Sequence, residues 1–381
     1  MRFDTRAIHA AQPPDPLTGA VNAPIYLSST FQQTAPDRNR GFVYSRTANP
    51  TRSVLERALA ALEGGRAGLA FSSGLGALAT LLEAFPSGSR IVSVDDLYGG
   101  TWRLFEHHRR QFGIRIDYVD MSRPEALAAA LEEGPTSLVY VETPTNPLLR
   151  LVDLAAVAGL AHAHGAVLAV DNTFASPALQ RPIERGADVV LHSTTKYIGG
   201  HSDLIGGALV LRRARDAARY AWLQNAVGAV PGPFDCFLTL RGLHTLGVRM
   251  RAHSAGALSV ARELEGRASV DRVHYPGLRS HSQHRLARRQ MDGYGGIVSV
   301  EIKGGRRAAL RFLKGLKLFT LAESLGGVES LAEHPASMTH ASVPRAEREA
   351  HGVTDGLVRL SCGVEDPEDL AADVARGLGR V

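Results

Sequence analysis

Short runs of apolar residues alternate with helical stretches through the first half of the chain, and this alternation constrains the fold more than any other feature. Each run is nearly continuous in apolar residues and is bounded by glycine, proline or polar residues. Strands that are buried on both faces of a parallel sheet have this pattern. It predicts an α/β fold on a large, mostly parallel sheet, which binds ligands beyond the carboxyl ends of its strands. The runs are Gly68 to Phe71, Arg90 to Val94, Ser137 to Val141, Ala166 to Val170 and Asp188 to Leu191.

Changes of pattern along the 381 residues predict three regions. Residues 1–48 are rich in proline, threonine and serine and show no sustained helical period, which predicts an extended arm that packs on something else. Residues 49–245 hold the alternating runs and helices. Residues 246–381 hold longer helices, such as Met250 to Gly266, and strand-like segments at Gly296 to Ile302 and Leu357 to Ser361. We expect this last region to form a smaller α/β domain.

Helix boundaries are marked at two places in the second region. One helix is expected to begin after Asn49-Pro50 and to end at Gly64-Gly65. A second is expected within Leu151 to His164, with Asp153 as its N-cap and Gly165 as its C-terminal stop.

Composition excludes several classes of protein. Hydrophobic residues make up 44% of the chain and charged residues 21%, as in ordinary globular proteins. The net charge is +5, but the basic residues occur as scattered pairs such as Arg212-Arg213, which indicates a solvated surface and no nucleic-acid partner. Cys236 and Cys362 are too few for a disulfide framework, so we expect a reducing, cytoplasmic setting. No run approaches the roughly 18 apolar residues of a membrane span, and no signal segment is expected.

A glycine-containing loop follows the first apolar run. Ser72 to Ala79 can be read as the dinucleotide pattern G-x-G-x-x-A, and Asp95 ends the next run. Such a loop is also a general way of binding phosphate at a helix N-terminus. Three interpretations therefore remain at this point: a nicotinamide dehydrogenase, another phosphate-containing cofactor, or a tight turn without a ligand.

Three later runs deliver polar groups to the same edge of the expected sheet. They end in Glu142 to Pro147, Asp171 to Thr173 and His192 to Tyr197, and the last of these segments contains Lys196. A dinucleotide enzyme does not need this lysine, whereas an enzyme of pyridoxal phosphate does. Its lysine carries the cofactor as a Schiff base, its aspartate keeps the pyridine nitrogen protonated, and hydroxyl groups hold the phosphate.

With these segments in place, the chain resembles the Cys/Met-metabolism family of pyridoxal-phosphate enzymes, and especially its cystathionine γ-lyases and γ-synthases. The resemblance runs nearly from end to end and implies the fold type I of the aspartate-aminotransferase-like enzymes. The matching segments are Tyr44-Ser45-Arg46, Asn49-Pro50-Thr51, Asp96 to Thr101, Glu142 to Pro147, Ser193 to Tyr197, Gln224-Asn225, Gly228 to Pro231, Leu321 to Gly327, Met338 to Ala341 and Arg359-Leu360-Ser361.

The resemblance implies a role for each cofactor-binding position. Lys196 would form the Schiff base, Asp171 would pair with the pyridine nitrogen, and Tyr98 would stack on the ring and act in catalysis. The phosphate would be held by Ser73, Gly74, Leu75, Ser193 and Thr195. Tyr44 and Arg46 would reach the phosphate in the neighbouring subunit, which implies shared active sites in a homotetramer made of two dimers.

The resemblance also implies how the substrate is bound. Arg359 would grip the α-carboxylate, with help from Asn146 and Ser324. Arg103 would meet a distal carboxylate, and Glu323 would meet the distal amino group. Val43 stands where cystathionine enzymes tend to have an acidic residue, and this departure leaves room for other sulfur-containing substrates.

We therefore expect a pyridoxal-phosphate-dependent carbon–sulfur lyase, namely a cystathionine γ-lyase. The alternatives are a cystathionine γ-synthase, then another sulfur amino-acid lyase or a sulfhydrylase. Two alternatives lie outside this chemistry. A nicotinamide dehydrogenase would have no use for Lys196, and a cofactor-sensing protein without catalysis would have no use for the set Tyr98, Asp171, Lys196 and Arg359. No metal site is expected, because no carboxylate or cysteine joins the pairs His162/His164 and His281/His284 at ligand spacing.

Overall fold

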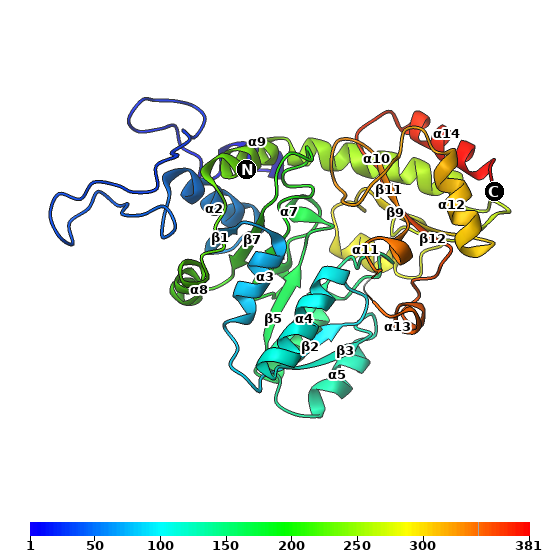
Figure 1. The fold of residues 1–381 in the computed structure, drawn as a ribbon, viewed down its shortest axis with the longest axis horizontal. Coiled ribbons are helices and arrows are strands. Elements are labelled where there is room, and N and C mark those ends of the chain that lie inside the picture. The colour runs from blue at the N-terminus through cyan, green and yellow to red at the C-terminus, as the bar shows by residue number, and fades with distance from the viewer. Residues whose placement is uncertain (342) are drawn as a thin grey trace.

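The computed structural model of the chain describes residues 1–341 and 343–381. Two β-sheets organise it, a larger one from the middle of the chain and a smaller one from the C-terminal part (Figure 1).

The larger sheet has seven strands in the order β1-β7-β6-β5-β4-β2-β3. The five strands from β6 to β3 are parallel to one another, and β7 runs antiparallel to both of its neighbours. The fold is therefore α/β with a mostly parallel large sheet, as predicted. The strands are β1 (Ala67–Phe71), β2 (Arg90–Val94), β3 (Arg115–Val119), β4 (Leu138–Glu142), β5 (Val167–Asp171), β6 (Val189–His192) and β7 (Gly207–Leu211).

All five apolar runs identified in the sequence form strands of this sheet, within one residue at each end. Two further strands, β3 and β7, were not expected. β3 lies at one edge of the sheet and is only partly buried. Its polar residues interrupt the apolar pattern by which a buried strand is recognised in the sequence. β7 is fully buried and as apolar as the predicted strands, but it follows a glycine-rich segment, and no strand was predicted there.

Alternate residues of the strands pack into two separate cores, one on each face of the sheet. In β4, Val139 and Val141 contact the core that contains side chains of α2 (Pro50–Glu63), α6 (Leu154–Ala163) and α9 (Pro233–His244). Leu138 and Tyr140 point to the opposite core, which contains side chains of α3 (Gly74–Leu82), α4 (Gly99–Phe112) and α8 (Ala214–Val227). Because both faces are covered, the strands need to be apolar throughout, which explains the continuous runs in the sequence.

The helices of this part begin and end as local sequence signals require. Asn49 caps α2 by accepting hydrogen bonds from two backbone N–H groups, and Asp153 caps α6. Gly64 and Gly165 follow these helices with φ of +78° and +70°, a conformation that favours glycine. The helices are α1 (Phe3–His9), α2 (Pro50–Glu63), α3 (Gly74–Leu82), α4 (Gly99–Phe112), α5 (Pro124–Glu132), α6 (Leu154–Ala163), α7 (Ser176–Leu179), η1 (Pro182–Arg185), α8 (Ala214–Val227) and α9 (Pro233–His244).

The smaller sheet has five strands in the order β10-β11-β12-β9-β8, and only β10 and β11 are parallel. A third core lies between this sheet and α10, α12 and α14. The elements are α10 (Leu246–Leu264), β8 (Val270–His274), α11 (His284–Gln290), β9 (Ile297–Ile302), α12 (Gly305–Gly315), β10 (Thr320–Leu321), β11 (Leu331–Glu333), η2 (Pro335–Ser337), α13 (Arg345–Ala350), β12 (Leu357–Ser361) and α14 (Pro367–Leu378).

The N-terminal segment forms an arm beyond its first helix. Residues 10–49 contain no helix or strand, and they extend away from the rest of the molecule (dark blue in Figure 1). The expectation that residues 1–48 lack a helix is wrong for α1, which contacts α2, α9 and α10. Asp4 forms an ion pair with Arg251 at 2.8 Å and thereby fixes this helix to α10. The division into 1–48, 49–245 and 246–381 stays a prediction.

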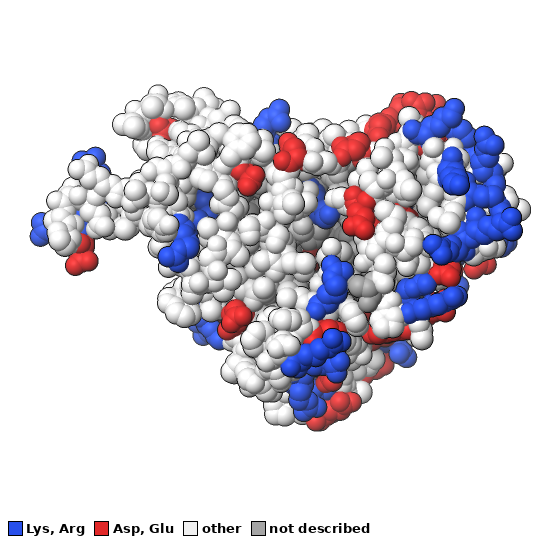
Figure 2. All heavy atoms as spheres, viewed as in Figure 1, with Lys and Arg blue, Asp and Glu red and all other residues white. Residues whose placement is uncertain are grey.

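Charged side chains are unevenly distributed over the surface. In Figure 2, basic side chains gather at the end of the molecule that carries α12 and α14, where acidic residues lie among them. The part of the same face between the arm and the smaller sheet carries few charges. Within the described residues, no helix has the length and apolar composition needed to span a bilayer.

Candidate active site

A cavity of about 340 Å³ lies at the carboxyl ends of β1, β4, β5 and β6 and extends to residues of the smaller sheet. Twelve of the predicted site residues line it. They are Ser73, Gly74, Leu75, Tyr98, Asn146, Asp171, Ser193, Thr195, Lys196, Glu323, Ser324 and Arg359.

One end of the cavity is suited to bind an anion. Ser73 caps α3 by accepting a hydrogen bond from Gly76 N at 2.9 Å, and the first-turn N–H groups of a helix have no partner within the helix. A Cβ atom on Gly74 would lie 3.0 Å from Cβ of Ser193, so this loop and the turn after β6 are in close contact. The helix N-terminus and the Ser193 hydroxyl thus provide donors for a phosphate group.

Lys196 lies between this end and the smaller sheet. Its Nζ donates a hydrogen bond to Oγ of Ser324 at 2.8 Å. Burial, together with the positive charge of Arg359, lowers the pKa of Lys196 to about 8. About a tenth of the amine is therefore neutral at pH 7, far more than for a lysine with the ordinary pKa, and the neutral form is the one that acts as a nucleophile or a proton acceptor.

Asp171 ends β5 on the floor of the cavity. Its Oδ1 accepts a hydrogen bond from Thr173 N at 2.9 Å, and its Oδ2 accepts one from the Tyr140 hydroxyl at 3.4 Å. Burial raises the pKa of Asp171, although the bonds from Thr173 and the charge of His192 act against this shift. Burial and the Asp171 carboxylate raise the pKa of neighbouring Glu142 well above its ordinary value. Repulsion between the two carboxyl groups favours a single negative charge on the pair, which a cationic ring nitrogen would stabilise on Asp171.

Tyr98 lies at the start of α4, and its backbone N–H donates to Oε2 of Glu142 at 3.0 Å. A Cβ atom on Gly100 would lie 2.3 Å from the Tyr98 ring. Glycine at position 100 therefore allows the ring to fold back over the helix and to line the cavity.

Arg359 is held in place on the side of the cavity that the smaller sheet forms. Its Nη1 donates to Oδ1 of Asn146 and to Glu333, each at 3.0 Å, and its Nη2 donates to the Ser324 carbonyl at 2.8 Å. Ser324 has φ of +94°, an unusual conformation for a residue other than glycine, and it bonds both Arg359 and Lys196. This fixed guanidinium group suits a carboxylate.

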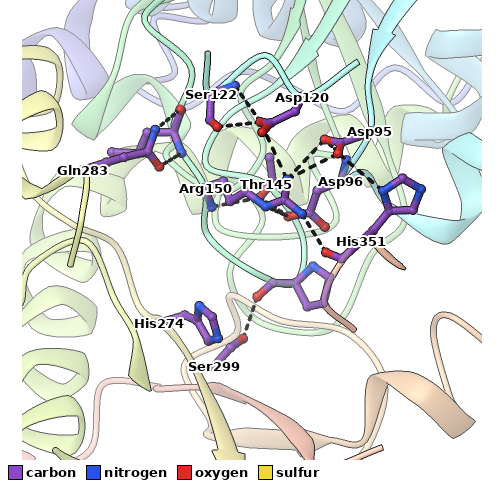
Figure 3. A network of polar contacts seen from close by, with 12 residues as sticks. Asp95, Asp96, Asp120, Ser122, Thr145, Arg150, His274, Gln283, Ser299 and His351 are labelled. Atoms are coloured by element: carbon purple, nitrogen blue, oxygen red, sulfur yellow. Dashed lines mark hydrogen bonds and ion pairs between the residues drawn. The ribbon is translucent and has the colours of Figure 1, made fainter. Parts of the chain in front are cut away.

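A network of ionic contacts fixes the segment that carries Asn146 (Figure 3). The Thr145 hydroxyl bonds Asp96, and Arg150 N donates to the Thr145 hydroxyl at 2.9 Å. The Arg150 side chain lies 3.4 Å from Asp95 and 3.7 Å from Asp96, and it donates to the His351 carbonyl at 2.6 Å. Because Asp96 is two residues before Tyr98, the network links the Tyr98 and Asn146 segments to the C-terminal part of the chain.

Three predicted residues do not line the cavity. Arg103 is exposed on α4. Tyr44 and Arg46 lie in the arm, where Arg46 stacks on the Tyr44 ring and donates to the Asn225 carbonyl at 2.6 Å. Their roles stay predictions.

Several residues of the site were not predicted from the sequence. Tyr140, Glu142, Thr173 and Thr339 line the cavity, and Glu333 forms a buried ion pair with Arg359. Glu142 directly follows an apolar run, so the sequence places it at the same edge of the sheet as Asp171 and Lys196, although no role was predicted for it. Glu333 lies opposite Arg359 in the register of β11 and β12, which the sequence alone does not reveal.

The donors of this cavity fit pyridoxal phosphate. An amine with a lowered pKa suits its aldehyde, a partly buried carboxylate suits its pyridine nitrogen, and the α3 N-terminus with Ser193 suits its phosphate. Across the described residues, no three His, Cys, Asp or Glu side chains are grouped so that they could bind a metal ion.

Comparisons with known proteins agree with this fit. A family model described as Cys/Met metabolism PLP-dependent enzyme matches residues 4–379. The chain is 50% identical to a cystathionine β-lyase of Coxiella burnetii, with 99% of this chain and 97% of that protein covered. It is 49% identical to a cystathionine γ-lyase of Dictyostelium discoideum, with 100% and 98% covered. It is 53% identical to a cystathionine γ-synthase of Mycobacterium bovis, with 98% and 96% covered.

The fold agrees equally well with solved structures. The cystathionine γ-synthase of Xanthomonas oryzae, solved in complex with cystathionine, superposes with a TM-score of 0.97 at 48% identity and covers 100% of this chain and 98% of its own. The similar proteins catalyse different reactions, so they establish the cofactor and the type of enzyme but leave the individual reaction open. The chain belongs to the Cys/Met-metabolism family of pyridoxal-phosphate-dependent enzymes.

Proposed function

We propose that the chain is a cystathionine γ-lyase, in which Lys196, Asp171 and Tyr98 are catalytic. The observation that carries the proposal is the Lys196 amine, which lines the same cavity as Asp171 and Arg359 and has its pKa lowered to about 8. When bound, pyridoxal phosphate acts as an electron sink that stabilises negative charge at the substrate Cα.

The surrounding residues would bind the cofactor at several points. Lys196 would attach it, and Asp171 would hold the proton of its ring nitrogen. Tyr98 would cover the ring. The phosphate would be bound by Ser73, Gly74, Leu75, Ser193 and Thr195, which all line one end of the cavity.

The substrate side provides the groups that the reaction requires. Arg359 binds the α-carboxylate and so directs the Cα–H bond toward the Lys196 amine, which removes that proton. A second proton is then lost from the substrate Cβ, which supplies the electrons that expel the sulfur from Cγ, and Tyr98 or Lys196 donates a proton to that sulfur. Glu323 is exposed at the mouth of the cavity, where it can meet the distal ammonium group of cystathionine. The overall reaction converts L-cystathionine and water into L-cysteine, 2-oxobutanoate and ammonia.

A second candidate is cystathionine γ-synthase, which is supported by the 53% identity to the M. bovis enzyme. Both reactions share the steps through loss of the γ-substituent, and they differ in whether water or a cysteine thiol completes the reaction. Val43 lies in the arm, at a position where cystathionine enzymes tend to have an acidic residue, and if the arm reaches a partner's site the missing carboxylate weakens binding of the distal ammonium group of cystathionine.

Parallel assays with the purified enzyme distinguish these reactions. We expect formation of 2-oxobutanoate from L-cystathionine to exceed formation of cystathionine from O-succinylhomoserine or O-acetylhomoserine with cysteine. A faster replacement reaction would overturn the lyase proposal in favour of the synthase. An enzyme that produces pyruvate from cystathionine would instead be a β-lyase.

We further propose that the enzyme is a homotetramer of two dimers, in which the arm of each subunit completes the partner's active site. Leu17, Val21 and Leu27 of the arm are 83%, 84% and 74% exposed, which is costly for apolar side chains unless another surface covers them. Arg46 and Tyr44 would then reach the partner's cofactor.

The two cysteines are buried and unpaired, which supports a reducing, cytoplasmic location.

A further inference from the structure

A buried carboxylate lies behind the cofactor side of the cavity and does not belong to the proposed catalytic set. Glu63 is the last residue of α2 and is fully buried, as is His192 at the end of β6. Oε1 of Glu63 accepts a hydrogen bond from Nδ2 of Asn172 at 2.9 Å and lies 2.6 Å from Nε2 of His192. Because the carboxylate oxygen is already an acceptor for Asn172, His192 donates the second bond.

The two donors adjoin the residues proposed to bind opposite ends of the cofactor. Asn172 directly follows Asp171, the proposed partner of the ring nitrogen. His192 directly precedes Ser193, a proposed phosphate ligand. One carboxylate oxygen therefore joins the ends of two neighbouring strands, β5 and β6, at the edge where the cofactor is expected to bind.

Other contacts make this junction rigid. Asn172 also donates to the Gln180 carbonyl at 2.7 Å and accepts from Nε2 of Gln180 at 3.0 Å, so its side chain is fixed on both sides. Oε2 of Glu63 and Nδ1 of His192 have no hydrogen-bond partner among the described residues. Burying a charged or strongly polar side chain costs free energy unless a hydrogen-bonding partner lies beside it. Removing either Glu63 or His192 would therefore leave the other buried without that partner.

We propose that Glu63 is a positioning residue for cofactor binding. Its Oε1 sets the spacing between the ends of β5 and β6, and so places Asp171 and Ser193 at the two ends of one pyridoxal phosphate molecule. This inference rests on the proposed roles of Asp171 and Ser193. In this proposal the Glu63–His192 pair does more than stabilise the fold. A change in the spacing between the ends of β5 and β6 would weaken the contacts of Asp171 and of Ser193 with the cofactor at the same time.

Asp188 offers a matched control on the same two strands. It lies just before β6, and its Oδ2 accepts from Leu168 N of β5 at 3.1 Å and lies 2.8 Å from Nε2 of His162. Asp188 therefore also joins β5 to β6 through a carboxylate beside a histidine, but at the opposite end from the cavity. A general loss of sheet stability would affect the Asp188→Ala and Glu63→Ala variants alike.

The test is a titration of each apoenzyme with pyridoxal phosphate, followed by the visible absorbance of the bound cofactor, together with the melting temperature of each apoenzyme. We expect Glu63→Ala to raise the Kd at least about tenfold, as the loss of a hydrogen bond to a charged group would. Glu63→Gln should raise it less, because its amide oxygen still accepts both bonds. Asp188→Ala should leave the Kd near the wild-type value even where its melting temperature falls.

Two results would overturn the inference while leaving the assigned function intact. One is an unchanged Kd in Glu63→Ala, and the other is an equal rise in Glu63→Ala and Asp188→Ala. If Glu63→Ala does not fold, His192→Ala and Asn172→Ala replace it, because each removes one of the two donors to Oε1 of Glu63, and a wild-type Kd in both would have the same meaning. A wild-type protein that does not bind pyridoxal phosphate would overturn the proposed function together with the inference.

Discussion

The substitution Arg359→Lys tests how the substrate carboxylate is recognised. Arg359 is buried and held by Asn146, Ser324 and Glu333, and its Nε has no hydrogen-bond partner among the described residues. A planar guanidinium group can bind a carboxylate through two parallel N–H bonds. Lysine preserves the charge but offers a single ammonium group, which Glu333 already attracts.

Loss of one hydrogen bond to a charged group costs about 1.5–3 kcal/mol. At about 1.4 kcal/mol for each factor of ten, kcat/KM should fall about 10- to 150-fold. Steady-state rates with L-cystathionine measure this, and the visible spectrum checks that the cofactor is still bound. Arg348→Lys is the control, because Arg348 is also buried and paired, with Asp355, but does not line the cavity. Wild-type kcat/KM in Arg359→Lys, or an equal loss in the control, would refute the assigned role.

Three other predictions follow from the same structure. Because the pKa of Lys196 is lowered to about 8, the rate at which the apoenzyme binds pyridoxal phosphate should rise with pH and level off above about pH 8. Stopped-flow absorbance measures this rate, and a rate that does not change with pH would contradict the prediction. The hydrogen bond to Asp95 raises the pKa of His351, so this pair should stabilise the protein fully below about pH 6.5 and lose its effect as the pH rises through the raised pKa. The melting temperature of His351→Gln should therefore differ from wild type near pH 6 and converge with it at alkaline pH, and a constant difference would argue against the pair. Arg46→Ala should retain the cofactor poorly, and hybrids with Lys196→Ala subunits should regain some active sites; no recovery after verified subunit exchange would argue against shared sites.

The larger sheet could be predicted because its strands are buried on both faces, which leaves continuous apolar runs in the sequence. β3 lacks this signal because it lies at the edge, and its residues Arg115 to Val119 mix polar and apolar side chains. The helix α1 could not be predicted, since its stability depends on packing of Phe3 and Ala7 against helices that are distant in sequence.

The candidate site was predictable where functional residues directly follow strands. Asp171 and Lys196 both lie just beyond such runs, and the family resemblance supplied their roles. Glu333 and Glu63 had no comparable signal, because their importance arises from buried partners more than 20 residues away in sequence, Arg359 and His192. Such pairs depend on how sheets and helices pack, which a local sequence pattern does not determine.

The central claim is that Lys196 carries pyridoxal phosphate. The most direct test is to reduce the cofactor-loaded enzyme with borohydride and to locate the attached cofactor by peptide mass spectrometry. The chain has three other lysines, Lys303, Lys314 and Lys317, all in the C-terminal region, so the assignment is unambiguous. We expect the cofactor on Lys196 alone. Attachment to another lysine, or to none in an enzyme that cleaves cystathionine, would contradict the account.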